Sequence, residues 1–178
     1  RSGFVRAFAH RATGVIDALR PDHVLFSYHG LPERQIRKAC PPGGVCLQSA
    51  SCCDRLEKTN RDCYRAQCFQ TTRDLLAALD WPADRASTTF QSRLGLARWT
   101  QPYTEQVLQE LPAQGIRRLA VLSPAFVADC LETLEEIGMR GRETFLEAGG
   151  TAFELVPSLN AQEDWAEAVA DWLAEAAG

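Results

Sequence analysis

Short apolar runs alternate with amphipathic stretches along most of this chain. Four runs have the length of strands and are separated by turn residues such as Pro and Gly; they lie at residues 24–26, 87–91, 118–122 and 152–156. Strands that are separated by helices pair in parallel, because a helical crossover returns the chain to the same end of the sheet. The pattern therefore predicts an α/β fold, with a parallel four-stranded sheet covered by helices on both faces.

The stretches between these runs carry apolar residues at helical spacing. In the last stretch, Trp165, Val169 and Trp172 fall on one face. The expected helices cover residues 3–19, a short polar stretch after residue 32, residues 64–79, 102–111, 129–137, 142–148 and the C-terminal stretch. A chain of 178 residues that is 46% hydrophobic is long enough for one core, so we expect one domain over residues 1–178.

The charge balance and hydropathy exclude two classes of partner. The formal net charge is -4, and 19 basic residues are spread among 23 acidic ones, whereas a nucleic-acid surface needs clustered Lys and Arg. No apolar run approaches the roughly 20 residues that span a bilayer, and residues 1–10 lack the apolar core of a signal peptide. We therefore expect a soluble, cytoplasmic protein without a nucleic-acid partner or a transmembrane segment.

Six of the seven cysteines fall between positions 40 and 68. A disulfide knot is disfavoured, because Cys52 and Cys53 are adjacent, the total is odd and the surrounding sequence is that of an ordinary intracellular α/β domain. Two Pro and two Gly at residues 41–44 and many polar residues predict an inserted loop at about residues 40–63. Metal ligation by the thiolates explains this clustering better than disulfides do.

Candidate functional residues follow the predicted strands. Ligands of parallel α/β sheets bind beyond the carboxyl ends of the strands, where the loops converge. His29 directly follows the first run and could accept a proton or bind a divalent metal. The alternative is a loop histidine whose ring is paired with the backbone. Residues 91–93 and 124–126 follow two further strands, so all three segments are expected to border one cleft.

Three acidic residues lie at helical spacing after the third strand. Asp129, Glu132 and Glu136 fall at i, i+3 and i+7 on one predicted helical face. Like charges at this spacing repel one another, so the stripe either faces water near the helix start or holds a cation. The helix starts at the same sheet edge as His29, which would let an imidazole and a carboxylate approach a common metal ion.

Five segments of the chain, in this order, resemble the motifs of ferrochelatases: residues 26–34, 90–95, Trp99 with 102–104, 124–136, and 158–160. The resemblance extends from about residue 22 to the C-terminus. Ferrochelatases insert ferrous iron into a porphyrin and have two similar α/β halves with the porphyrin in the cleft between them. The resemblance implies that residues 1–178 are the C-terminal, chelatase-like half, similar to flavodoxin and Rossmann domains, and that the N-terminal half is absent.

The resemblance also implies roles for individual residues. His29 and Glu132 match the catalytic histidine and glutamate, which also meet the substrate iron, and the sequence leaves the division of roles between them open. Glu136 and Asp129 match acidic positions along the metal or proton path. The substrate-binding residues would be Tyr28, Trp99 and Phe126, although plain core packing is an equal alternative for Trp99.

The cysteine-rich segment resembles that of bacterial ferrochelatases that hold a 2Fe-2S cluster in an internal segment. The expected ligands are Cys46, Cys52, Cys53 and Cys63, with Cys40 and Cys68 in reserve. Zinc held by four thiolates is the alternative. Cys130 follows a different strand and is expected to pack as a small apolar residue.

The implied activity is the insertion of Fe²⁺ into a porphyrin in haem biosynthesis, with release of two protons. The expected porphyrin is protoporphyrin IX, and coproporphyrin III is the less favoured alternative. The implied partners are the porphyrin, ferrous iron and the missing N-terminal half; peripheral membrane contact stays open. The half by itself is expected to be inactive. Two alternatives are a non-catalytic half-chelatase that senses through an Fe-S cluster or a bound tetrapyrrole, and a cobalt or nickel chelatase. Intact His29 and Glu132 favour an enzyme, and the Glu-rich helix favours iron.

Overall fold

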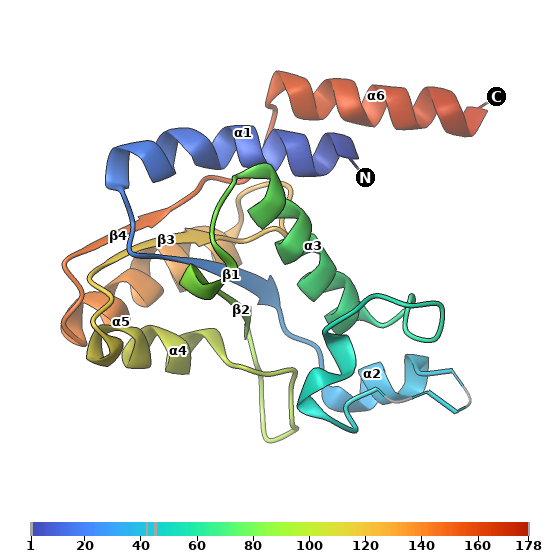
Figure 1. Ribbon diagram of the computed structural model, residues 1–178, viewed down its shortest axis with the longest axis horizontal. Helices are drawn as coiled ribbons and strands as arrows, with labels where there is room; N and C mark the ends of the chain where they lie inside the picture. The colour runs from blue at the N-terminus through green and yellow to red at the C-terminus, as the bar shows by residue number, and fades with distance from the viewer. Residues whose placement is uncertain (1, 42, 45, 178) are drawn as a thin grey trace.

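The computed structural model describes residues 2–41, 43–44 and 46–177. Four parallel strands form one sheet in the order β2-β1-β3-β4 (Figure 1); they are β1 (His23–His29), β2 (Ala86–Gln91), β3 (Arg118–Leu122) and β4 (Ala152–Leu155). The predicted parallel sheet is confirmed. β1 is longer than its apolar run, because Ser27, Tyr28 and His29 also pair with β2.

The described residues include six α-helices: α1 (Ser2–Leu19), α2 (Glu33–Ala39), α3 (Tyr64–Ala78), α4 (Thr104–Glu110), α5 (Arg142–Glu147) and α6 (Glu163–Ala177). Three short 3-10 helices occur at Ala50–Cys53 (η1), Ala83–Arg85 (η2) and Leu111–Gln114 (η3). Most helix starts and ends lie within a few residues of the predicted ranges. Among the described residues, no helix combines the length and apolarity needed to cross a membrane.

The two faces of the sheet carry separate apolar cores. Side chains alternate along β1, so that Phe26 packs with α1 and α3 while Leu25 faces the opposite core. That second core includes Leu108 of α4 and Phe145 of α5, and both side chains are buried. Helices therefore cover both faces, with α1 and α3 on one and α4 and α5 on the other (Figure 1).

The segment after β3 differs from the prediction of two separate α-helices. Glu132–Gly141 is a π-helix (η4), which forms i→i+5 hydrogen bonds and continues directly into α5. Two of its glycines allow close packing: a Cβ at Gly138 would lie 3.2 Å from Leu155, and one at Gly141 would lie 3.2 Å from Leu108. Asp129 precedes the helix, so the prediction that Asp129 shares a helical face with Glu132 is wrong.

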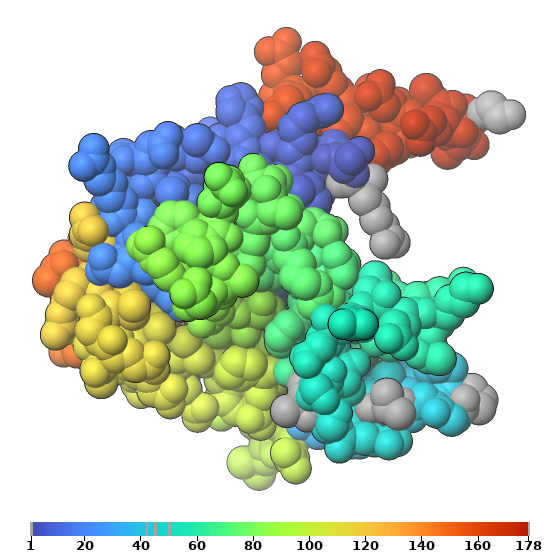
Figure 2. Space-filling view, viewed as in Figure 1, coloured from blue at the N-terminus to red at the C-terminus, as the bar shows by residue number. Residues whose placement is uncertain are grey.

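A third, smaller cluster of buried residues lies around the cysteines, which form a lobe beside α2 (Figures 1 and 2). Cys46, Cys53 and Cys63 are buried there together with Ile36 and Ala66. We call residues 40–63 the cysteine segment. Between α2 and α3 the regular element is the single 3-10 turn η1, as far as the structure describes this segment.

Candidate active site

His29 ends β1 at the carboxyl edge of the sheet. Its Nδ1 lies 2.6 Å from the carbonyl oxygen of Gly30. Because a carbonyl only accepts, Nδ1 carries the hydrogen, and Nε2 of the neutral ring carries the lone pair. The ring of Phe126 lies beside the imidazole, with 6.1 Å between ring centroids. This arrangement offers Nε2 as a proton acceptor or metal ligand.

Glu132 begins the π-helix at the same edge and lies within electrostatic reach of His29. A hydrogen bond from the Cys130 thiol lowers the pKa of Glu132, and its own backbone N–H and the electrostatic effect of the His29 ring lower the pKa further, against a small opposing effect of burial. The carboxylate is therefore ionised at neutral pH. Cys130 is half-buried, so it packs only in part as the small apolar residue that the sequence predicts.

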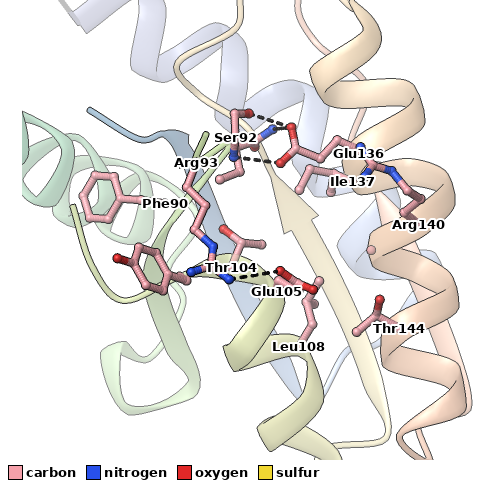
Figure 3. A pocket seen from close by; sticks show the side chains of 13 residues that line it. Phe90, Ser92, Arg93, Thr104, Glu105, Leu108, Glu136, Ile137, Arg140 and Thr144 are labelled. Atoms are coloured by element: carbon pink, nitrogen blue, oxygen red, sulfur yellow. Dashed lines mark hydrogen bonds and ion pairs between the residues drawn. The ribbon is translucent and has the colours of Figure 1, made fainter. Parts of the chain in front are cut away.

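Glu136 is anchored to the end of β2. Its carboxylate accepts hydrogen bonds from the Ser92 backbone N–H at 2.7 Å, from the Ser92 hydroxyl at 2.6 Å and from Gln91 Nε2 at 3.4 Å (Figure 3). Ser92 adopts a left-handed conformation with φ of 63°, which is uncommon for a residue with a side chain. Strain of this kind is retained where the surrounding contacts fix the backbone, and here those contacts hold Glu136.

Asp129 serves a different purpose from the two glutamates. It accepts hydrogen bonds from Asn160 Nδ2 at 2.7 Å, the Ser158 N–H at 3.1 Å and Thr133 Oγ1 at 3.3 Å. Burial alone would raise the pKa of Asp129, but these hydrogen bonds outweigh it and lower the pKa. Asp129 thus ties the start of the π-helix to the loop after β4. The predicted stripe of three carboxylates is divided between two environments.

Gln91 links the sheet to the π-helix through a buried polar network. Its Nε2 donates to the backbone carbonyl of Glu132 at 2.7 Å, and its Oε1 accepts from Ser27 Oγ at 2.8 Å. Ser27 also contacts Thr104 Oγ1 at 2.8 Å, and Thr104 donates to Thr89 at 2.9 Å. The sequence placed residues 91–93 at this edge without a role. The available signal was the polar side chains of Ser27, Thr89 and Gln91 at buried positions of the strands.

The three aromatic candidates lie in different places. Tyr28 is 3% exposed and its hydroxyl contacts Thr72 Oγ1 at 3.0 Å. This contradicts the prediction that Tyr28 binds substrate, because its side chain points into the core against α3. Trp99 is partly exposed and packs on the turn after His29, where a Cβ at Gly30 would lie 3.3 Å from Trp99 Cε3. Trp99 and Phe126 therefore flank His29.

A cavity of about 280 Å³ opens beside Glu136, between α4 and the π-helix (Figure 3). Arg93 covers one side, with its guanidinium 4.7 Å from the ring centroid of Tyr103 and 3.9 Å from Glu105. Arg140 lines the other side and pairs with Glu135 at 2.7 Å. The cavity is at the lower limit of pockets that enclose a drug-sized ligand. A large flat ligand would have to lie outside it.

Five cysteines converge in the cysteine segment. The Sγ atoms of Cys52 and Cys53 lie 3.6 Å apart, and the Cys46 N–H donates to Cys40 Sγ at 3.4 Å. Cys46, Cys53 and Cys63 are buried in one cluster, and Cys40 and Cys52 pack against it. Cys68 is a residue of α3, and its side chain packs in the main core.

The thiols of this segment differ in acidity. The hydrogen bond from Cys53 lowers the pKa of Cys63 to about 5 against the effect of burial, with help from the N–H groups at the start of α3 and from Cys46. Burial raises the pKa of Cys46 to about 12, and donation to Cys63 raises that of Cys53. All seven cysteines are free thiols. Within the described ranges, no three or more His, Cys, Asp or Glu side chains are arranged as a metal site.

The donor chemistry of the segment nevertheless suits a soft metal group. Thiolates are the ligands of Fe-S clusters and of structural zinc, and four are needed for either. Cys46, Cys52, Cys53 and Cys63 are all in the convergent set, and Cys40 is beside them. The residues therefore fit such a group by chemistry and by proximity, although their sulfur atoms do not form a coordination geometry.

Comparison with known proteins gives one consistent family. A family model described as ferrochelatase matches residues 1–177. The chain is 54% identical over 151 residues to a ferrochelatase of Azotobacter vinelandii. The matched residues make up 84% of this chain and 44% of that protein. The chain is 52% identical over 149 residues to one of Stutzerimonas stutzeri (83% and 44%) and 45% identical over 168 residues to one of Pseudomonas entomophila (94% and 50%).

These relatives extend well beyond the matched part, since the chain spans about half of their length. The match includes the strand ends that carry His29 and Glu132, and the family model covers nearly every residue of the sheet and its helices. The chain belongs to the ferrochelatase family.

Proposed function

We propose that the protein containing this chain is a ferrochelatase, which inserts Fe²⁺ into a porphyrin in haem biosynthesis. The observation that carries the proposal is the presence of His29 and an ionised Glu132 at one edge of the sheet. Metal insertion removes two pyrrole protons, and this edge offers two acceptors. Imidazole nitrogen and carboxylate oxygen also bind a borderline cation such as Fe²⁺.

We place the porphyrin across the edge of the sheet and not inside the cavity beside Glu136. Trp99 and Phe126 flank His29 and present aromatic surface there. Leu94, Leu96 and Leu131 follow the ends of β2 and β3 and are 80%, 106% and 77% exposed. Exposed apolar side chains that rim a polar site are typical of ligand-binding surfaces. The other half of the enzyme would cover the second face of the macrocycle.

The same apolar rim favours protoporphyrin IX over coproporphyrin III. Protoporphyrin carries two vinyl groups where coproporphyrin carries two further charged propionates. Burying an unpaired carboxylate against leucines costs free energy, whereas burying a vinyl group is favourable. We expect higher kcat/KM for protoporphyrin IX when both porphyrins are compared in the same assay.

We further propose that Cys46, Cys52, Cys53 and Cys63 hold a 2Fe-2S cluster, with Cys40 in reserve and zinc as the alternative. The convergence of these thiols supports the assignment. A cluster bound there would supply cross-links between distant positions of the segment, and the binding free energy of such a site contributes to folding. Cys68 is excluded as a ligand in this proposal because it packs in the main core.

A polypeptide limited to these residues should bind porphyrin weakly and have little activity, because half of an apolar cleft leaves one face of the ligand in water. We assign the chain as the C-terminal domain, completed by an N-terminal half, and propose that the enzyme acts in the cytoplasm. A sensor without catalysis is the second candidate, supported by the thiol cluster.

Replacement of His29 by Ala in the full-length protein tests the proposal. Porphyrin metallation, followed by absorbance with Fe²⁺, should fall at least about a hundredfold, as for loss of a general base. Circular dichroism and porphyrin binding should stay near the parent values, because His29 is not in either apolar core. Near-normal turnover would refute the enzyme assignment and favour the sensor. Faster insertion of Co²⁺ or Ni²⁺ than Fe²⁺ by the parent protein would refute the choice of metal.

A further inference from the structure

Tyr64 connects the candidate active site to the cysteine segment. It is the first residue of α3 and directly follows Cys63. Its hydroxyl donates to the backbone carbonyl of His29 at 2.7 Å. Its ring packs both against the main core and against the buried cysteines. A single side chain thus contacts both regions.

The contact lies where β1 loses its support from β3. β3 pairs with β1 only as far as Phe26, whereas β1 continues to His29. On the other side, the amide of Gly30 still donates to Gln91 at 2.8 Å. The Tyr64 hydroxyl therefore fixes the strand end on a side where the sheet no longer does. The orientation of the His29 imidazole depends on this backbone, because Nδ1 is bound to the carbonyl of the next residue.

The other end of the link depends on the cysteines. The carbonyl of Cys63 accepts the hydrogen bond of Gln67 that opens α3, and the Cys63 side chain is buried in one cluster with Cys53. Cys53 is 1% exposed and lies in the same cluster as the Tyr64 ring. A change in the packing of these sulfur atoms would therefore move the start of α3, and with it the Tyr64 hydroxyl.

We propose that Tyr64 is a positioning residue, which holds the end of β1 and transmits the order of the cysteine segment to His29. The proposal rests on the proposed roles of His29 and the cysteines. The contacts of Tyr64 that support it are all made with residues of this chain. Leu31, two residues after His29, also packs on the cysteine cluster and supports the same connection.

The test is a double-mutant cycle of Tyr64→Phe and Cys53→Ser in the full-length protein. Phenylalanine keeps the ring and removes the hydroxyl. The readout is amide hydrogen exchange of Gly30 by NMR, measured in iron-free and in iron-loaded protein, with the amide of Val156 at the far side of the sheet as internal reference. Each single variant should raise Gly30 exchange about three- to tenfold, as expected for loss of one neutral hydrogen bond.

The double variant should exchange no faster than the faster single variant, because both changes break the same link. The chemical shift of the His29 Cε1 hydrogen should move with Tyr64→Phe. The matched control is Tyr28→Phe, which removes a buried hydroxyl one residue from His29 that contacts Thr72 instead. It should leave Gly30 exchange within twofold of the parent.

Unchanged Gly30 exchange in Tyr64→Phe would overturn the positioning role. The transmission from the cysteine segment to His29 would be overturned if the two substitutions raised Gly30 exchange additively. It would also be overturned if Cys53→Ser left Gly30 exchange unchanged. Failure of the proposed function gives a different result. Full turnover of His29→Ala would remove the catalytic assignment, and protein that binds neither iron nor zinc would remove the cofactor assignment. In both cases the hydrogen-exchange rates of the variants could still be measured and compared.

Discussion

The carboxyl edge of the sheet and the cysteine segment are neighbours that are stabilised in different ways. At the edge, Glu136 has three donors and Gln91 binds both Ser27 and the π-helix. In the cysteine segment, the hydrogen bonds of the buried Asn60 are local, to Glu57, Cys52 and Arg55. The other buried side chains described there are the thiols of Cys46, Cys53 and Cys63.

The difference shows which region is organised by the fold itself. The polar groups of the edge are held by strands, helices and a buried hydrogen-bond network. The cysteine segment buries few branched aliphatic residues, so it gains little from the hydrophobic effect. A ligand that joins its sulfur atoms would supply the missing stabilisation. Removal of single groups from each region should therefore have separable effects.

The largest expected effect concerns catalysis at the edge. Glu132→Gln should reduce turnover by about 10²- to 10⁴-fold, because it removes an ionised acceptor beside His29. Glu135→Gln is the matched control, since Glu135 pairs with Arg140 and should change turnover less than about threefold. Steady-state kinetics with Fe²⁺ and porphyrin measure both. Equal losses in the two variants would mean that the helix presents the wrong residue to the site.

The second prediction concerns the cysteine segment alone. Protein made without oxygen should contain about two irons and two sulfides per chain. Cys53→Ser should bleach the visible absorbance and expose residues 40–63 to proteolysis, with the unfolding free energy of the sheet little changed. Cys130→Ser should keep the cluster, because Cys130 contacts Glu132 and not the segment. Colourless protein with one zinc per chain would instead identify a structural zinc site.

The third prediction tests the edge without touching a catalytic group. Gln91→Leu should lower the free energy of unfolding by about 1–3 kcal/mol, because buried Ser27 and the Glu132 carbonyl lose a partner. Urea denaturation measures this. Proteolysis of the cysteine segment should not change, which keeps the two regions distinct. Gln70→Leu is the control, since the amide of Gln70 binds Asp74 on the surface of α3.

The smallest effect lies at the opposite end of β1 from His29. Burial, assisted by Arg85, lowers the pKa of His23 from 6.5 to about 4. The unfolded chain therefore binds a proton that the folded protein does not, so this stability is complete above pH 6.5 and is lost as the pH falls toward 4. Between pH 7.5 and 5.5 the free energy of unfolding should fall by about 1 kcal/mol.

His23→Gln should remove this part of the pH dependence, and His10→Gln should retain it, because the His10 ring is exposed beside Asp164. Urea unfolding at several pH values measures the difference. An identical pH profile for His23→Gln and the parent protein would contradict the assignment of this window to His23.

The sheet could be predicted because apolar runs and helical spacing report burial directly. The rule that sites follow strand ends also predicts from the sequence that His29 and Glu132 lie at one edge of the sheet. Alternation along a strand could have separated Tyr28 from His29, since neighbouring side chains point to opposite faces. The family motif outweighed that signal, and the assignment of Tyr28 to the substrate was wrong.

The π-helix could not be predicted from spacing. Apolar residues at three- and four-residue intervals suit an α-helix equally well, and the choice depends on tertiary contacts. Here Gly138 and Gly141 approach β4 and α4 closely, and Gln91 binds the carbonyl of Glu132. The thiol–carboxylate contact of Cys130 depends on the same local geometry, which starts the helix three residues later than predicted.

The strand order has a consequence for how this site can change. The chain leaves β1 toward β2 on one side and returns to β3 on the other, so the connections after β1 and β3 run in opposite directions from a common topological switch point. His29 ends β1, where the first connection begins, and Phe126 and Glu132 lie on the second connection. Because the two connections diverge, insertions in either one can reshape the crevice without disturbing the strands beneath it. Substrate range can therefore be altered by loop length alone, while the sheet stays the same.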